Sequence, residues 1–172
     1  MPADYPLSEN SPVDVVRRTD TPIFQFTGEH VRGQAENPRT GQPDPGRLAA
    51  MPKPARTVYF LWLFRCEAAA NGLEVFILNG LGCFSREVHA ALKEVGAREL
   101  AQRLEMAIAL ARHACAEFKR LPDTTWFEQF DAEPRYATLH ALDEDGTYDL
   151  VENLTATVVA YIRVHRRALF DG

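Results

Sequence analysis

Long hydrophobic runs are missing from this chain of 172 residues. The most apolar stretch, VYFLWLF at residues 58–64, has seven residues, whereas a helix that crosses a bilayer needs about 20. The N-terminus also lacks the basic start and apolar stretch of a secretory signal. We therefore expect a soluble, cytoplasmic protein that does not engage a membrane.

Cysteine is scarce, and the known catalytic motifs are absent. The three cysteines, Cys66, Cys83 and Cys115, include no C-x-x-C pair, so neither a disulfide framework nor a zinc site is indicated. The five histidines show no metal-ligand spacing: they are His30, His89, His113, His140 and His165. No P-loop, dinucleotide fingerprint or nucleophile elbow occurs either. We expect no metal, no cofactor and no enzymatic activity.

Proline is rare beyond residue 54, since nine of the eleven prolines lie within residues 1–54. Proline interrupts regular structure, so residues 1–55 are predicted to form an irregular, proline-rich arm lying partly on the domain. Within the arm, PIFQFTGEHV at residues 22–31 could form a short strand or an apolar clip. Residues 56–170 form the domain, and 46% hydrophobic content is enough for one core.

Helical periodicity dominates after residue 56, which predicts an all-α single domain. Val88, Ala91, Leu92 and Val95 share one face, and Gly96 marks a helix end. A second stripe comprises Leu100, Leu104, Ala107, Ala111, Cys115 and Phe118. A short helix is expected at TTWFEQF, residues 124–130, capped by Asp123 or Thr124. The last helix should run from about Tyr148 to Leu169. His113 and His165 both fall within predicted helices, where we expect their imidazoles to be packed or hydrogen-bonded.

The segment NGLEVFILNG at residues 71–80 has two competing interpretations. Its paired Asn-Gly steps around a short apolar run are typical of a strand between turns. However, no second alternating run lies nearby to pair with a strand. We therefore predict a helix over residues 57–70, a break at Asn71-Gly72, and a short helix over residues 73–78.

Three ordered elements resemble the bacterial DNA-mimic protein domain, a family long known only as a domain of unknown function. They are EAAANGLEVFILNGLG, a helix ending in Ala-Leu-x-x-x-Gly-Ala, and a late AYIRVH. The matching residues are Asn71, Gly72, Phe76, Asn79, Ala91, Leu92, Gly96, Ala97, Tyr161, Ile162 and His165. One glycine of the family's Asn-Gly-Gly is missing, and Val75 stands where glutamine is usual. Over residues 58–170 the resemblance implies an all-helical, non-enzymatic protein whose acidic surface imitates DNA phosphates.

The charge is ordinary in total, at −5, but unevenly distributed. Residues 121–155 contain nine acids and one base, Arg135, for a net charge of −8, so the remainder carries +3. These nine acids, the acidic lobe, are Asp123, Glu128, Asp131, Glu133, Asp143, Glu144, Asp145, Asp149 and Glu152. Such carboxylates could compete for a groove that normally holds DNA phosphates. Alternatively, Asp143 to Asp145 and Asp149 are simply a solvated loop and helix start.

The leading interpretation is a non-catalytic acidic binding protein whose lobe engages a basic protein, with a DNA-binding protein as the first candidate. An immunity-type protein that neutralises a toxin is an alternative, since acidic surfaces also speed association with basic targets. An unrecognised enzyme with a cleft near Asn71 and Asn79 is another. Arg163, Arg166 and Arg167 suit the negative end of the last helix, so direct nucleic-acid binding is not predicted. The oligomeric state stays open.

Overall fold

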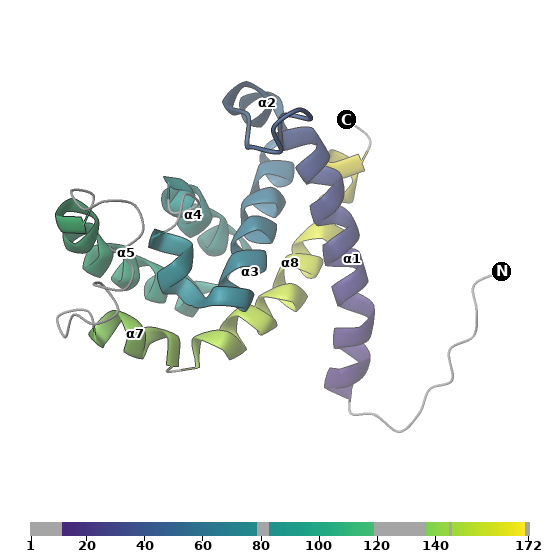
Figure 1. Ribbon diagram of the computed structural model, residues 1–172. Helices are drawn as coiled ribbons and strands as arrows, with labels where there is room; N and C mark the ends of the chain where they lie inside the picture. The colour runs from purple at the N-terminus through teal and green to yellow at the C-terminus, as the bar shows by residue number, and fades with distance from the viewer. Residues whose placement is uncertain (1–11, 79–82, 119–136, 145, 171–172) are drawn as a thin grey trace.

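The computed structural model describes residues 12–78, 83–118, 137–144 and 146–170 (Figure 1). The described helices are α1 (Pro12–Ala35), α2 (Pro45–Ala50), α3 (Lys53–Leu78), α4 (Ser85–Val95), α5 (Arg98–Phe118), α7 (Ala137–Glu144) and α8 (Thr147–Phe170). Within these ranges the β-structure consists of one isolated bridge between Glu36 and Pro43. The prediction of an all-α fold is confirmed. None of the described helices combines the length and apolar character needed to span a membrane.

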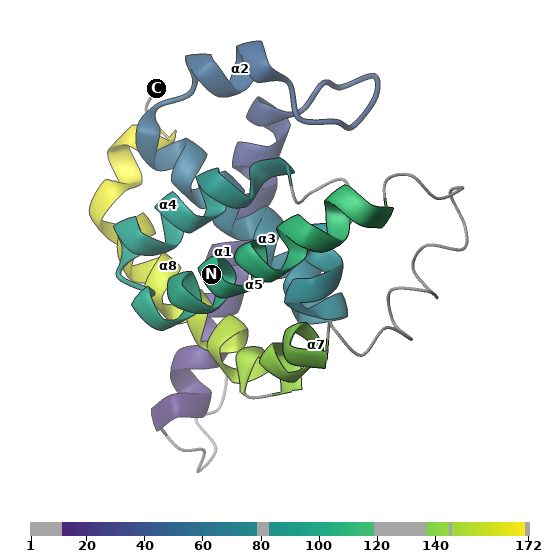
Figure 2. The ribbon, with the colours of Figure 1, turned by 90° about the vertical axis from the view of Figure 1, so that its left-hand side faces the viewer.

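The core is built around α3, which contacts α1, α4, α5, α7 and α8. In Figure 2, α4 and α5 lie in front of α3 and α1 lies behind it, so α3 is covered on opposite sides. This position explains the apolar run at residues 58–64: a helix surrounded by other helices is hydrophobic on all its faces. Val58, Tyr59, Leu61 and Phe64 are accordingly buried.

Between residues 12 and 35 the N-terminal region is not the irregular arm that its prolines predicted, and residues 1–11 lie outside the described residues. Residues 12–35 form a helix of 24 residues with Pro22 inside it, so the strand that was one of two alternatives for residues 22–31 is wrong. Phe24, Val31 and Ala35 are buried, while α1 packs on α3 and α8. An interior proline costs a helix about 3 kcal/mol. Burial of this apolar stripe offsets that local cost, because tertiary packing supplies most helical stability in proteins.

A glycine permits the close approach of α1 to α3. A Cβ atom on Gly28 would lie 1.8 Å from Cδ1 of Trp62, so a larger residue would force the indole aside. Arg32, one turn further along α1, lies over the same indole at 5.5 Å from the ring centroid. The proline-rich region is therefore joined to the domain by specific contacts.

The predicted break within NGLEVFILNG is confirmed. Two helical pieces of α3 meet at Gly72, whose φ of 83° and ψ of 173° are non-helical. Only glycine adopts this backbone region without substantial strain. After the break, Leu73, Phe76 and Ile77 are buried, so the second piece contributes to the core. Asn79 and Gly80 lie outside the described residues.

The remaining helices largely follow the apolar spacing. On α5, Leu100, Leu104, Ala107 and Ala111 are buried as predicted, while the side chains of His113, Cys115 and Phe118 lie outside the described part. The predicted helix at residues 124–130 also falls outside the described residues. The last helix, α8, runs from Thr147 to Phe170, within one residue of the predicted bounds, and buries residues including Leu154, Val158 and Ile162.

Candidate acidic interface

The structure places four residues of the acidic lobe on two consecutive helices. Asp143 and Glu144 end α7, and Asp149 and Glu152 lie near the start of α8. The side chains of Asp143 and Glu144 are not described. Asp123, Glu128, Asp131, Glu133 and Asp145 lie outside the described residues. The interface can therefore be built upward from the segment that joins α7 to α8, here called the α7–α8 turn (residues 143–147).

Arg103 of α5 fastens this turn to the body of the domain. Its Nη1 donates hydrogen bonds to the carbonyl oxygen of Leu142 (3.4 Å) and to Oγ1 of Thr147 (3.3 Å). Thr147 in turn donates its hydroxyl proton to the Leu142 carbonyl. Gly146 lies between them with a φ of 71°. One guanidinium group thus binds the backbone carbonyl just before the turn and the side chain of the last residue of the turn.

Arg103 also forms an ion pair with an acid that does not belong to the acidic lobe. Its Nη2 lies 3.6 Å from Oε1 of Glu99, whose side chain is largely exposed. The spacing of four residues between Glu99 and Arg103 on a helix could have suggested this pair. Nothing in the sequence could have indicated that the same arginine reaches Leu142 and Thr147, because 39 and 44 positions separate them.

The helix dipoles explain only part of the acidic distribution. Asp149 is exposed in the first turn of α8, where the positive end of the dipole stabilises a carboxylate. Asp143 and Glu144 instead occupy the last turn of α7, which contains no basic residue. The helix dipole does not favour acidic residues in a last turn, because its negative end lies there. Simple dipole compensation within each helix therefore accounts for Asp149 but not for these two acids.

Glu152 forms an internal ion pair. Nη2 of Arg65, on α3, lies 3.2 Å from Oε1 and 3.4 Å from Oε2 of Glu152. Nε of the same arginine donates to Oγ1 of Thr155 at 2.9 Å. Because its charge is already paired, Glu152 contributes less to the outward potential than Asp149 and helps instead to join α8 to α3.

The residues of the family pattern near Gly72 have structural roles. Phe76 is fully buried and meets Phe64 edge to face, with ring centroids 5.0 Å apart. Asn71 is exposed, and its Nδ2 donates to Oε1 of Glu67 at 3.3 Å. Asn79, its proposed partner in a cleft, lies outside the described residues. The contact of Asn71 lies in the helical piece before the break, and the contact of Phe76 joins the piece after the break to the piece before it.

A polar junction unites the other two elements of the pattern. Tyr161 of α8 donates to Oε1 of Glu94 on α4 at 2.5 Å, and Nζ of Lys53 lies 2.9 Å from Oε2. Burial acts to raise the pKa of Glu94, but the hydrogen bonds from Tyr161 and Lys53 outweigh it and hold that pKa below its ordinary value. Burial and the bond to Glu94 raise the pKa of Tyr161 to about 12. His165 packs on Tyr161, with ring centroids 4.3 Å apart.

The end of α4 positions Glu94 for this junction. The N–H of Gly96 donates to the Lys93 carbonyl at 3.2 Å, and the N–H of Ala97 donates to the Leu92 carbonyl at 2.9 Å. Gly96 has a φ of 87°, the left-handed conformation that commonly ends helices. The predicted helix end is confirmed, and it directs the chain into α5.

The described part of the chain contains no group of three or more His, Cys, Asp or Glu side chains arranged to hold a metal. Cys66 and Cys83 are thiols that take part in no disulfide. Partial burial raises the pKa of both, which keeps the thiols protonated and less nucleophilic.

Comparison with known proteins gives one positive result. The model of a family described as "DMP19-like protein" matches residues 49–165. Neither the curated proteins nor the solved structures yielded a match. The matched range includes α3, α4, α5, α7 and most of α8, together with all three elements of the DNA-mimic pattern. The chain therefore belongs to the DMP19-like protein family, as its resemblance to the DNA-mimic domain implied.

Proposed function

We propose that this protein is a non-catalytic binding protein whose acidic lobe occupies the basic surface of a partner, and that the partner binds DNA. The observation that carries the proposal is the concentration of nine acids against one base between residues 121 and 155, inside the matched family range. The rest of the chain is net positive. Charge is thus segregated along the chain instead of spread over it.

The contacts of Arg103 and Arg65 support the proposal physically. Both arginines bind groups on or beside the acidic segment, and they hold the start of α8 against α5 and α3. A surface that is already ordered loses less conformational entropy when it binds. Duplex DNA presents about one charge per 1.7 Å of axis, so a competitor needs carboxylates held at defined positions.

A capture experiment with matched charge variants tests this function. The lobe variant carries Asp143→Asn, Glu144→Gln and Asp149→Asn. The control variant carries Glu29→Gln, Glu87→Gln and Glu105→Gln, which removes the same charge from exposed acids on α1, α4 and α5. Immobilised wild type and control should retain a DNA-binding protein from the native lysate, and the lobe variant should not.

Two further conditions identify the mode of binding. Added salt should release the partner, since ionic contacts are screened. Duplex DNA should displace the partner from the immobilised protein, because DNA and the acidic lobe would compete for the same basic groove of the partner. Equal retention by the lobe variant would refute the role of these acids. A basic partner that duplex DNA cannot displace would instead favour the immunity-type alternative.

A further inference from the structure

A second surface lies at the end of α8 opposite to the α7–α8 turn (Figure 1). It is formed by Phe26 and His30 of α1 and by Phe170 of α8, here called the aromatic patch. Phe26 is 66% exposed and Phe170 is 42% exposed. The rings of Phe26 and Phe170 stack with centroids 6.3 Å apart, and the His30 ring lies 5.2 Å from Phe170. All three residues lie outside the range that matches the family.

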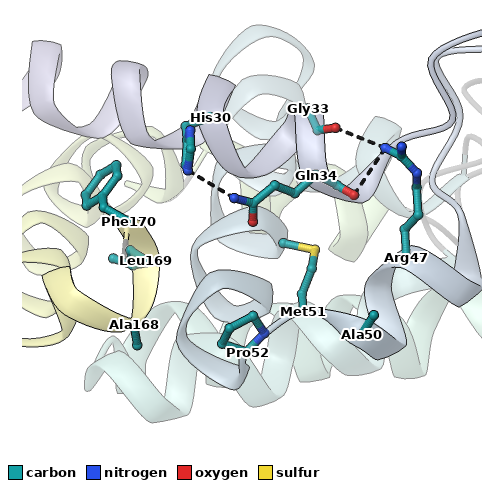
Figure 3. A pocket seen from close by; sticks show the side chains of 10 residues that line it. All are labelled: His30, Gly33, Gln34, Arg47, Ala50, Met51, Pro52, Ala168, Leu169 and Phe170. Atoms are coloured by element: carbon teal, nitrogen blue, oxygen red, sulfur yellow. Dashed lines mark hydrogen bonds between the residues drawn. The ribbon is translucent and has the colours of Figure 1, made fainter. Parts of the chain in front are cut away.

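A hollow of about 550 Å³ opens beside the aromatic patch (Figure 3). His30 and Gln34 of α1 line one side, while Met51 and Pro52, which join α2 to α3, line the other. The space suits one bulky apolar side chain, because Met51, Pro52 and Leu169 offer it apolar contacts.

Cations border the same surface. Arg166 and Arg167 are exposed and precede Phe170 by four and three residues, so helical geometry places them beside its ring. Arg163 continues this row and remains 57% exposed although it binds Asp20 at 2.8 Å. Glu36, which directly follows α1, is likewise paired with an arginine, Arg32 of α1, at 2.8 Å. Glu29 of α1 is also exposed next to His30, and against this one carboxylate Arg166 and Arg167 bring two positive charges to the neighbourhood of Phe170.

We propose that the aromatic patch and its hollow bind an acidic protein segment that carries a bulky apolar side chain. The apolar side chain would enter the hollow beside Phe170, and carboxylates on either side of it would contact Arg166 and Arg167. Exposed apolar patches rimmed by polar residues commonly mark such interfaces. A protein ligand is favoured over a single-stranded nucleic acid because Phe26 and Phe170 contact each other and leave no gap between them for a base.

This surface is independent of the acidic lobe in location and in sign of charge. It arises because α1, the segment that lies before the family range, packs against the end of α8. The proposal therefore stands whether or not the lobe imitates DNA. It assigns a binding role to the N-terminal region, in addition to the role proposed for the acidic lobe.

Selection from a library of random short peptides, displayed on phage and panned against the full chain, provides the test. Peptides that also bind a Phe26→Ser, Phe170→Ser variant are removed by counter-selection. The surviving peptides should be enriched in Asp and Glu around one large apolar residue. If none survives, or if acids are not enriched, the proposal is wrong.

The best peptide, labelled with a fluorophore, then serves as the probe for binding measurements. Its affinity should fall about tenfold or more for the Phe26→Ser, Phe170→Ser variant and for an Arg166→Gln, Arg167→Gln variant. Met106→Ser, which alters an exposed apolar side chain on α5, should not change it. All substituted side chains are exposed, so circular dichroism should show unchanged folding. A labelled oligothymidylate serves as the competing probe. If it bound wild type more tightly than the peptide, and if the same variants abolished its binding, the choice of a protein ligand would be overturned.

Discussion

Tyr161 donates a hydrogen bond of 2.5 Å to Glu94 across 67 positions of sequence. Lys53 completes the junction by binding the second carboxylate oxygen, so the start of α3, the end of α4 and the middle of α8 meet at one carboxylate. This contact explains physically why two distant elements of the family pattern, a helix ending in Gly-Ala and a late tyrosine, occur together.

Replacing Tyr161 with phenylalanine should lower the free energy of unfolding by about 1 kcal/mol. The change removes one hydrogen bond to a carboxylate and leaves the ring in place. Urea denaturation followed by circular dichroism measures the loss. Tyr148→Phe is the matched control, because Tyr148 is 59% exposed on the same helix and should tolerate the change. Equal effects of the two substitutions would contradict the importance of the junction.

The junction also predicts a dependence of stability on alkaline pH. The pKa of Tyr161 rises from 10.0 to about 12 on folding, so the folded state retains a proton that the unfolded state releases. Its contribution is complete below pH 10 and is lost as the pH rises towards 12. Urea midpoints measured across this range should fall less steeply in Tyr161→Phe than in wild type. A residual slope is expected from Tyr59, whose pKa burial and Glu36 also raise.

Two phenylalanines on α1 provide a test of its place in the fold. Phe24 is 2% exposed and Phe26 is 66% exposed. Phe24→Ala should therefore cost about 3 to 4 kcal/mol through lost burial and a cavity, whereas Phe26→Ala should change stability by less than about 0.5 kcal/mol. Thermal and urea unfolding provide the values. Similar small effects would mean that α1 is peripheral to the core.

Gly72 and Gly33 should respond to alanine in opposite directions. Alanine at Gly72 must adopt a φ of 83° and ψ of 173°, at an expected cost of about 1 to 3 kcal/mol. Gly33 lies within α1, and a Cβ atom there meets nothing within 4 Å. Gly33→Ala should thus stabilise the protein by about 0.5 kcal/mol through helix propensity. Destabilisation by both changes would argue against the break in α3.

Glu152 and Asp149 should separate stability from partner binding. Glu152→Gln removes the ion pair with Arg65 and should lower stability by up to about 1 kcal/mol, with little change in partner capture. Asp149→Asn should weaken capture, because Asp149 is exposed, and alter stability less. The two variants can be compared by urea denaturation and by the capture assay described above. If Glu152→Gln weakened capture as strongly as Asp149→Asn, the ion pair would not isolate Glu152 from the partner.

Local patterns in the chain were sufficient to predict α3, α4, α5 and α8, whereas α7 (Ala137–Glu144) was not predicted. The apolar spacing of α4 and α5, the helix end at Gly96 and the break at Asn71-Gly72 all depend on residues within a few positions of one another. The same local reasoning failed for residues 12–35, where prolines and glycines indicated an irregular arm. The packing of α1 on α3 and α8, with Phe24 and Val31 buried and Gly28 close to Trp62, stabilises that helix, and no local pattern contains these contacts.

For the candidate interface, the sequence by itself determined the composition of the acidic lobe, the net charge of −8 over residues 121–155 and the family of the chain. Only the tertiary structure decided that Glu152 is paired with Arg65, that Arg103 holds the α7–α8 turn, and that Phe26 and Phe170 share an exposed surface. Charge and periodicity are properties of neighbouring residues and can be read along the chain. Pairing and burial depend on which helices pack together, because they join side chains from distant segments of the chain.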